Sequence, residues 1–524
     1  MHVPLVLTEF LDRAVELYGG KTAVIDDHHT LTYRELNDRV NQLSRGLESL
    51  GVKKGDKVAY LAPNTTEMLE GFYGVFQIGA VMTPLNTRLK PSDYHFILEH
   101  SESKVLFVDY TLYPQVEDIV RDVPSLDHII VHGDPSEGGY EAWLNNFSSL
   151  PFERSKVEET DIASLLYTSG TTGDPKGVLL SHRSNYLHAL SSMHHLKVSD
   201  QDTLLHVLPM FHVNGWGSPF YYTANGATQV MLRETDPDLI LDKVQKHKVS
   251  VLHMAPTVLN MVIEAFEVNA PVIGHDVRVV IAGSAPPPAF VRKVEEVLKW
   301  KFVQVYGMTE ISPLITTSEL RSMDIDRPAE ERYRLKAKAG YSMIGSRVKV
   351  IDEFGDPVPY DGASIGEIVT RSNNVMEGYY KNEKATSEAV RDGWLYTGDM
   401  AVVDEEGNIE IVDRKKDVII SGGENISSIE VEGTLYEHPS ILEAAVVAVP
   451  HEKWGEVPHA VVVPRDGETL SAEEVILFCR EKLAHFKAPK SVSFMKELPK
   501  TASGKIQKVL IRKEFWKNHS RMIN

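Results

Sequence analysis

The chain has 524 residues, of which 42% are hydrophobic and 25% charged, so it can bury more than one core. Acidic residues outnumber basic ones by 74 to 55, a formal net charge of −19, which argues against a protein that binds nucleic acid. The single cysteine, Cys479, excludes an internal disulfide framework and a cysteine-rich zinc site. No secretory signal is evident, and the most apolar stretch, residues 71–82, is too short for an integral membrane segment. The sequence therefore predicts a protein of a reducing compartment, the cytoplasm.

The first half of the chain alternates helix and strand patterns. Thr32 and Glu35 have the spacing of a capping box, and apolar residues at helical spacing follow as far as Gly51. Apolar runs that predict strands lie at residues 58–61, 105–108, 129–131, 162–166, 249–252, 277–282 and 302–305. Residues 256–266 and 288–300 predict helices between them. This alternation is typical of α/β layers around parallel strands.

From about Ser346 the pattern changes to short strands and turns, which predicts a small β-rich subdomain. A charged stretch at 413–417 then precedes a final α+β block, with a helix predicted from Ser471, capped by Glu474, to about His485. The predicted fold class is α/β. A large N-terminal domain (1–412) contains layered α/β subdomains and the β-rich subdomain, and a small α+β domain (413–524) follows.

The end of the chain is basic although the protein as a whole is acidic. Between Arg480 and Lys517 there are eleven basic residues and only three acidic ones. Two interpretations stay open at this point: a solvated helix face with a charged terminus, or a segment that attracts a polyanionic substrate.

The sharpest local signal is the segment 167–177, Tyr-Thr-Ser-Gly-Thr-Thr-Gly-Asp-Pro-Lys-Gly, which follows a predicted strand. Its glycines let backbone N–H groups approach phosphate oxygens, its hydroxyls donate hydrogen bonds, and Lys176 supplies a positive charge. The spacing is not that of a Walker A loop. Taken alone, such a segment could also be only a flexible loop.

This segment resembles the signature loop of the adenylate-forming superfamily, which comprises acyl-CoA synthetases, luciferases and peptide-synthetase adenylation domains. Further strings resemble that superfamily's motifs, in its order, at 209–215, 283–286, 306–310, 396–399, 413–417, 421–425 and 499–505. The resemblance covers the chain from about Thr30 to Lys508. It implies ATP and coenzyme A as co-substrates and Mg²⁺ as the metal cofactor.

The resemblance also implies a nucleotide site. Tyr306 would lie against the adenine, Asp399 and Arg414 would hold the ribose hydroxyls, and Glu310 would bind Mg²⁺. Without the resemblance, each would be read as an ordinary core tyrosine, turn charge or surface carboxylate. The implied ATP- and AMP-binding residues are Thr168, Ser169, Gly170, Thr171, Thr172, Gly173, Lys176, Gly283, Ser284, Ala285, Tyr306, Gly307, Met308, Thr309, Asp399, Arg414 and Lys505.

Catalysis and domain movement are assigned by the same resemblance. Lys505 would bridge the attacking carboxylate and the nucleotide and stabilise charge on the α-phosphoryl group. The implied catalytic residues are Lys505, Lys176, His212 and Thr309. Asp413 matches the hinge about which the small domain rotates between adenylation and thioester formation. The implied coenzyme A contacts are Ser421, Gly422, Gly423 and Lys487.

The acid substrate is predicted from the segment 212–216, which is similar to that of fatty acyl-CoA synthetases, where a tryptophan gates an apolar tunnel. Val213 stands where amino-acid-activating relatives have an aspartate, which disfavours an ammonium-bearing substrate. The implied acyl-binding residues are His212, Val213, Asn214, Trp216 and Gly307. Trp216 could equally be a core tryptophan.

The predicted function is an AMP-forming acyl-CoA synthetase acting on a medium- to long-chain fatty acid. Three alternatives remain: a ligase for short-chain, branched or aryl acids, an acyl-AMP ligase that uses a carrier protein or amine, and a catalytically silent nucleotide-binding protein. The oligomeric state is open, although long-chain relatives are often homodimers. The final residues, 521–524, are not a peroxisomal Ser-Lys-Leu address.

Overall fold

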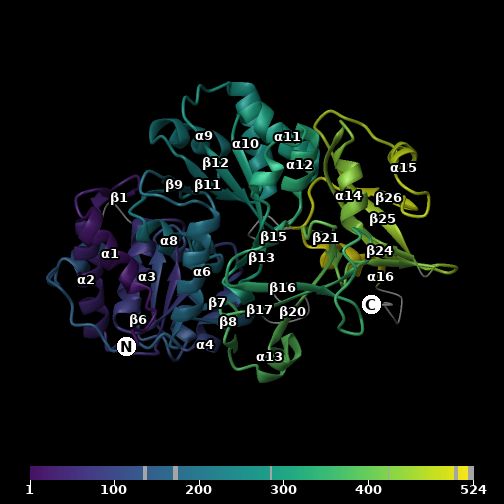
Figure 1. The fold of residues 1–524 in the computed structure, drawn as a ribbon. Coiled ribbons are helices and arrows are strands. Elements are labelled where there is room, and N and C mark those ends of the chain that lie inside the picture. Colours follow the sequence, from purple (N-terminus) through teal and green to yellow (C-terminus); the bar gives the residue numbers. More distant parts are fainter. Residues whose placement is uncertain (134–138, 169–174, 284–285, 423, 501–505, 517–524) are drawn as a thin grey trace.

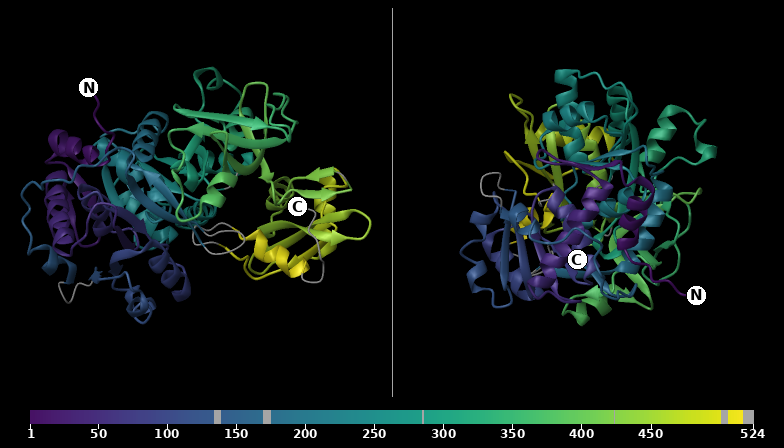
Figure 2. Two further views of the ribbon diagram at one scale, coloured as in Figure 1. Left: turned by 90° about the horizontal axis from the view of Figure 1, so that it is seen from below. Right: turned by 90° about the vertical axis from the view of Figure 1, so that its left-hand side faces the viewer.

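The structure is a computed structural model that describes residues 1–133, 139–168, 175–283, 286–422, 424–500 and 506–516. Two large sheets and their helices form most of the N-terminal part, and the C-terminal residues form a lobe of their own at the other end (Figure 1). A view from below shows the same lobe beside the rest of the chain (Figure 2). Several predicted site residues lie outside the described residues: Ser169, Gly170, Thr171, Thr172, Gly173, Ser284, Ala285, Gly423 and Lys505.

The first sheet is parallel in its middle and antiparallel at its edges. Its strands are β1 (Thr22–Ile25), β2 (Thr30–Thr32), β9 (Thr203–His206), β10 (Thr228–Met231), β11 (Val251–Met254), β12 (Arg278–Ile281), β13 (Lys301–Gly307), β14 (Leu314–Thr317) and β15 (Tyr341–Ser342). Their order is β15-β14-β13-β12-β11-β9-β10-β1-β2. Parallel pairing from β13 to β1 confirms the predicted α/β arrangement.

The second sheet has the order β18-β8-β7-β4-β3-β5-β6. Its strands are β3 (Lys57–Leu61), β4 (Val81–Pro84), β5 (Ser103–Asp109), β6 (His128–His132), β7 (Ile162–Thr168), β8 (Lys176–Ser181) and β18 (Gly378–Tyr379). The strands β7 and β8 are antiparallel and flank the predicted phosphate loop, so Thr168 and Lys176 face each other across the ladder. The edge strand β18 comes from a part of the chain about two hundred residues further on.

Helices pack between and around these sheets. In the N-terminal part they are α1 (Thr8–Tyr18), α2 (Tyr33–Ser49), α3 (Thr66–Gln77), α4 (Pro91–Ser101), α5 (Gly139–Leu144), α6 (His182–His195), α7 (Val213–Trp216), α8 (Ser218–Ala224), α9 (Pro237–Lys246), α10 (Pro256–Asn269), α11 (Pro288–Lys293), α12 (Ala329–Ala337) and α13 (Glu383–Ala389). Every residue of α3 is buried, and one hydrophobic cluster joins it to strands of both sheets. A Cβ on Gly74 would lie 2.6 Å from the Leu43 side chain, so the close packing of α3 on α2 requires glycine there.

The β-rich subdomain and the C-terminal domain each have a sheet of their own. The subdomain sheet contains β16 (Ser346–Ile351), β17 (Gly366–Ser372), β19 (Val390–Arg391), β20 (Trp394–Val403) and β21 (Ile409–Arg414). The C-terminal sheet contains β22 (Ile419–Ser421), β23 (Glu424–Ile426), β24 (Ile441–His451), β25 (Gly455–Pro464) and β26 (Ser491–Phe494), covered by α14 (Ser428–Tyr436), α15 (Ala472–Lys482) and α16 (Lys508–Trp516). This arrangement confirms the predicted fold class.

Local predictions hold with small differences at the ends of elements. The capping boxes of Thr32 with Glu35 and of Ser471 with Glu474 are both present. The strand expected from residue 249 begins at Val251, because Val249 N–H still bonds to Val244 O at the end of α9. The helix expected at 288–300 changes at Val294 into a π turn, and the one expected to reach His485 ends at Lys482. None of the described helices combines the length and apolarity needed to cross a membrane.

Candidate active site

Three predicted ribose and adenine residues, far apart in sequence, meet at the end of β13. The Tyr306 hydroxyl donates to Asp399 Oδ2 at 2.7 Å, and Arg414 Nε lies 3.3 Å from Asp399 Oδ1. Asp399 and Arg414 are directly opposite each other in the β20–β21 ladder, so strand pairing sets their contact. Burial, together with the Asp399 charge, raises the pKa of Tyr306 well above its usual value, which keeps its hydroxyl a donor.

Gly307 ends β13 where the backbone folds back on itself. A Cβ at this position would lie 1.7 Å from the Pro313 carbonyl oxygen, so no larger residue fits. Met308 N–H donates to the same oxygen at 3.1 Å and closes a short loop. Thr309 and Glu310 lie in this loop as a single 3₁₀ turn, and both are buried. The glycine therefore fixes the place at which these two side chains leave the sheet.

Glu310 is held by a residue that the sequence did not single out, Tyr379. The Tyr379 hydroxyl donates to Glu310 Oε1 at 2.8 Å, and Met376 N–H donates to the Glu310 backbone oxygen at 2.8 Å. Burial raises the pKa of Glu310, although the Tyr379 hydrogen bond acts in the opposite direction. The amino group of Lys176 lies 5.0 Å from the centre of the Tyr379 ring. Tyr379 thus contacts both the predicted metal ligand and the predicted phosphate-binding lysine.

The residues present fit a Mg²⁺ ion that is shared with a nucleotide. Magnesium is typically bound by one or two carboxylates together with substrate phosphates and water. Glu310 offers one buried carboxylate, and the described residues contain no cluster of three or more His, Cys, Asp or Glu side chains that would form a cage made only of protein. This donor set suits an ion that arrives with ATP.

The segment after His212 has an unusual backbone. Val213, Asn214, Gly215, Trp216 and Gly217 all have positive φ, between 49° and 73°. A left-handed residue other than glycine costs roughly 1–2 kcal/mol, and a β-branched valine is especially unsuited to it. Such a turn persists only where surrounding contacts enforce it, which is common at ligand-binding sites.

Buried contacts enforce this turn. The Asn214 amide group donates to Ser164 Oγ at 3.0 Å on β7 and to Asn185 Oδ1 at 3.2 Å on α6. The fold thus uses the Asn214 amide, a predicted acyl contact, to anchor the turn. Met210, just before the turn, is fixed by Asn64, whose Oδ1 accepts from Met210 N–H at 2.7 Å. Neither Asn64 nor Asn185 has a local sequence pattern that reveals this role.

Trp216 is carried by the turn into a buried aromatic cluster. Its exposed fraction is 5%, and its ring stacks on His253 with centroids 5.9 Å apart and an interplanar angle of 24°. His253 Nε2 lies 3.2 Å from the Tyr222 hydroxyl, and burial lowers the pKa of His253 to about 3, so the imidazole is neutral. The buried cluster around Trp216 is therefore aromatic and uncharged.

The predicted hinge is bound firmly to the C-terminal domain. Asp413 Oδ2 accepts from both the backbone N–H and the hydroxyl of Ser428, each at 2.6 Å, at the start of α14. Lys508, the first residue of α16, donates to Ser428 Oγ at 2.6 Å and pairs with Glu432 Oε1 at 2.7 Å. Adjacent to Asp413, Arg414 points to the opposite side, toward Asp399. We call Asp413, Ser428, Glu432 and Lys508 the hinge cluster.

The basic C-terminal segment is partly neutralised by acidic residues earlier in the same domain. Lys487 Nζ lies 2.7 Å from both carboxylate oxygens of Glu430, and Lys482 pairs with Glu437 at 2.6 Å. Lys508 is buried in the hinge cluster, so neither solvation nor attraction of an anion describes it. Lys487 as a coenzyme A contact stays a prediction.

The predicted coenzyme A contacts Ser421 and Gly422 lie at the end of β22. Ser421 is paired with Gly455, and Gly422 N–H donates to the Trp454 backbone oxygen at 2.9 Å. Gly422 has φ +63°, and a Cβ there would lie 2.6 Å from the Trp454 ring, so the position requires glycine. Trp454 thus packs directly against one of the predicted coenzyme A contacts.

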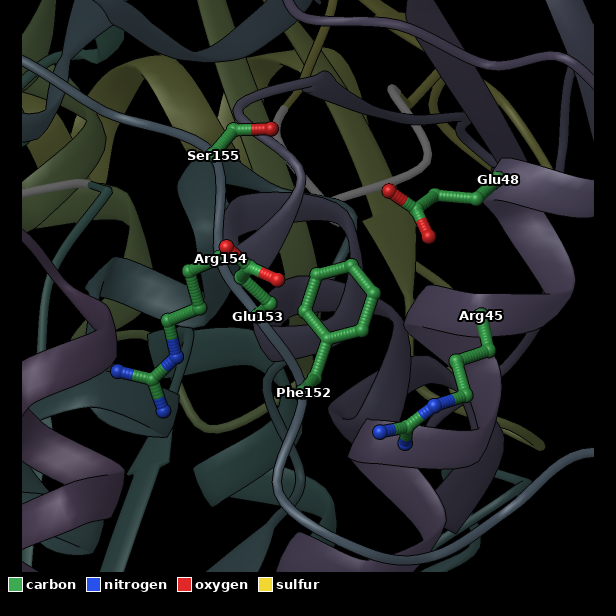
Figure 3. A pocket seen from close by; sticks show the side chains of 6 residues that line it. All are labelled: Arg45, Glu48, Phe152, Glu153, Arg154 and Ser155. Atoms are coloured by element: carbon green, nitrogen blue, oxygen red, sulfur yellow. The ribbon is translucent and has the colours of Figure 1, made fainter.

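Two surface hollows among the described residues do not include Tyr306, Glu310, Asp399 or Arg414 in their lining, although Asn64 lines the second. One, of about 410 Å³, is lined by Arg45 and Glu48 of α2 and by residues 152–155 (Figure 3). Arg45 fixes the neighbouring segment by donating to the backbone oxygens of Leu150 and Pro151, each at 2.7 Å. The second, of about 230 Å³, lies at the ends of β3, β9 and β10 and is lined by Pro63, Asn64, Thr87, Arg88, Val207, Pro209, Phe211, Leu232, Arg233, Glu234 and Thr235.

Comparison with known proteins places this site in a family. Residues 11–380 match the model of the AMP-binding enzyme family, and residues 430–505 match the model of its C-terminal domain. Two curated relatives from Arabidopsis thaliana, a peroxisomal butyrate–CoA ligase and a peroxisomal benzoate–CoA ligase, are each 38% identical, over 98% of this chain and 93% of theirs. The crystal structure of the anthranilate CoA ligase AuaEII with anthranoyl-AMP superposes with a TM-score of 0.90 at 27% identity, covering 98% of each chain. The chain belongs to the AMP-binding enzyme family, as an AMP-forming CoA ligase.

Proposed function

We propose that this CoA ligase activates a small carboxylic acid, either short-chain, branched or aromatic, rather than a medium- to long-chain fatty acid. The observation that carries the proposal is the buried stack of Trp216 on His253, held by the left-handed turn. If the acyl tunnel passes Trp216, as the resemblance to fatty acyl-CoA synthetases implies, a long acyl chain would require the Trp216 ring to leave this stack. The names of the two Arabidopsis relatives support the same size range, because butyrate and benzoate are small acids.

The proposed reaction begins with attack of the acid carboxylate on the α-phosphorus of ATP. Asp399 and Arg414 would hold the ribose, and Tyr306 would lie against the adenine while donating to Asp399. Mg²⁺ bound at Glu310 would neutralise part of the triphosphate charge as pyrophosphate leaves. Lys176 is exposed beside Tyr379 at the start of β8, where it can reach phosphate oxygens. Thr309 would donate to the α-phosphate, and His212 would border the acid.

The second step requires a different arrangement of the small domain, and we propose that it rotates about Asp413. Adenylation needs Lys505 over the α-phosphate, whereas thioester formation needs a path for the thiol of coenzyme A. Ser421 and Gly422 would border that path, and Lys487 would meet coenzyme A phosphates after exchanging its partner Glu430. A domain boundary at 412/413 accords with the hinge cluster, since the Asp413 side chain contacts Ser428 of α14, which in turn contacts Lys508 of α16.

A substrate panel tests the proposal. The protein is mixed with ATP, Mg²⁺, coenzyme A and acetate, butyrate, 2-methylpropanoate, benzoate, cinnamate, octanoate or palmitate, and the acyl-CoA and AMP formed are measured by mass spectrometry. We expect the highest kcat/KM for one of the acids between butyrate and cinnamate. A preference for octanoate or palmitate would refute the small-acid proposal and restore the fatty-acid prediction.

Two further properties stay predictions. The cytoplasmic location rests on the sequence alone, and the two Arabidopsis relatives are named as peroxisomal. The homodimer rests on the resemblance, and the molar mass in solution would decide it.

A further inference from the structure

Tyr379 is fixed in space by the same strand that carries Lys176. It lies in β18, opposite Val178 of β8, and the next residue's N–H donates to the Gly177 carbonyl oxygen at 2.7 Å. On its other side, Tyr379 N–H donates to Thr386 Oγ1 at 2.9 Å. Because its backbone is held from both sides, the direction of its side chain is set by β8.

The side chain then joins two groups that adenylation needs. Its hydroxyl donates to Glu310 Oε1 at 2.8 Å, and its ring lies 5.0 Å from the amino group of Lys176. Its own strand segment also bonds to the Glu310 backbone through Met376. Glu310 and Lys176 come from different sheets, the one following β13 and the other beginning β8, so Tyr379 contacts one group from each sheet.

We propose that Tyr379 is a positioning residue for adenylation, which orients the Glu310 carboxylate for Mg²⁺ and holds Lys176 beside it. This inference rests on the proposed role of Glu310 as the metal ligand. A glutamate side chain has several rotamers, and a donor on Oε1 selects one of them and leaves Oε2 for the ion. Loss of such an outer partner typically lowers metal affinity by about 10- to 100-fold.

The Lys176 contact is a separate part of the role. A cation over an aromatic ring is attracted to the ring face by a modest amount at an exposed site, which corresponds to a change of a few-fold in binding. Phenylalanine at position 379 would keep this contact and lose the hydroxyl, whereas leucine would lose both. The two substitutions therefore separate the effect on the metal from the effect on the lysine.

The test uses the variants Tyr379→Phe and Tyr379→Leu, with Tyr380→Phe as a matched control. The Tyr380 hydroxyl lies 3.2 Å from Glu102, on the exposed side of the same segment, so the same chemical change is made there without touching Glu310. Binding of Mn²⁺ in the presence of a non-hydrolysable ATP analogue is measured by electron paramagnetic resonance. Binding of the analogue with EDTA is measured by calorimetry.

We expect Tyr379→Phe to weaken Mn²⁺ binding by on the order of 10-fold and to leave metal-free analogue binding unchanged. Tyr379→Leu should weaken both, and Tyr380→Phe neither. Equal Mn²⁺ affinity in Tyr379→Phe and Tyr380→Phe would overturn the inference. So would a parallel loss of metal-free binding in Tyr379→Phe, or a melting temperature that falls enough to explain the change.

Glu310→Gln separates failure of this inference from failure of the proposed function. If Glu310→Gln binds Mn²⁺ as tightly as the wild type, Glu310 is not the metal ligand and both proposals lose that residue. If Glu310→Gln loses Mn²⁺ but Tyr379→Phe does not, only the positioning role of Tyr379 is wrong. Neither result depends on which acid the enzyme uses.

Discussion

Two groups of charged residues differ in the exposure of their side chains, although they adjoin at Asp413 and Arg414. In the ribose group, Tyr306 and Asp399 are buried, whereas the Arg414 side chain is open, at 40% exposed. The hinge cluster is sealed, with the Lys508 and Glu432 side chains only 14% and 13% exposed. Open charges can exchange a protein partner for a ligand, whereas sealed charges are committed to one another. This difference supports the two proposed roles, with the first group binding the ribose and the second lying at the domain boundary.

The largest expected effect comes from substitution of Lys505, which the small domain would place over the α-phosphate. Lys505→Ala should lower acyl-AMP formation by about 10²- to 10³-fold, by analogy with loss of one oxyanion donor. Thioester synthesis from supplied acyl-AMP should be largely unaffected, because the proposed mechanism uses Lys505 only over the α-phosphate. Both half-reactions can be followed separately by mass spectrometry. Equal loss in both would contradict the division of labour between the two domain positions.

The next effect tests whether the hinge cluster is structural. Lys508→Met would leave Glu432 and Asp413 buried without their cation, which should cost about 3 kcal/mol of unfolding free energy. The double variant Lys508→Met with Glu432→Gln removes both charges and should recover part of this loss. Denaturant unfolding of the four proteins in this cycle measures the coupling. Additive losses would mean that the pair contributes nothing as a pair.

A smaller effect is expected for a substitution in the ribose group. Asp399→Asn should weaken ATP binding by about 10-fold, since hydrogen bonds to a charged group contribute roughly 1.5–3 kcal/mol. Its unfolding free energy should change little. Glu410→Gln, on the neighbouring strand β21 with an exposed side chain, is the control. Unchanged nucleotide affinity in Asp399→Asn would show that the ribose assignment is wrong.

The smallest effect is a pH dependence of stability. Burial raises the pKa of Glu432 to about 7, against the opposing influence of Lys508 and the Val446 N–H, and Asp413 adds to the rise. Because the folded state holds this proton more tightly than the unfolded state, the associated stability is complete below about pH 4.5 and is lost as pH rises through 7. Tyr436 also faces Glu432, but it stays protonated over this range.

Glu432→Gln removes this titration. Between pH 5 and pH 7 the unfolding free energy of the wild type should fall relative to that of Glu432→Gln, by at most about 1.4 kcal/mol per pH unit. Calorimetric or denaturant unfolding at several pH values gives the difference. Parallel curves for the two proteins would place the titration on another group.

Local sequence patterns predicted much of the fold but little of the site. The capping boxes at Thr32 and Ser471 and the apolar strand runs depend on neighbours in sequence, and the structure confirms them. The meeting of Tyr306, Asp399 and Arg414 was expected only from the resemblance, because no local pattern relates β13 to β20. Tyr379 is one of 20 tyrosines, and its role depends on a contact with a strand two hundred residues earlier.

At other residues the sequence predicted the wrong environment or gave no prediction of the backbone conformation. Lys508 reads as one more charge in a basic segment, yet burial beside Glu432 removes it from the surface. The left-handed turn could not be foreseen either, because Val213 strongly disfavours positive φ and only the anchoring of Asn214 compensates. At these residues, tertiary contacts override the local preference for solvent exposure or for negative φ.

The alternation of side chains along β21 directs Asp413 toward the small domain and Arg414 toward Asp399. If the small domain rotates about Asp413, as proposed, Arg414 and the residues after it would move with that domain, and Arg414 would separate from Asp399 and Lys415 N–H from the Gly398 oxygen. The strength of ribose binding and the orientation of the small domain would then change together. The proposed movement that admits the thiol would then also weaken nucleotide binding, so nucleotide affinity would report the position of the small domain.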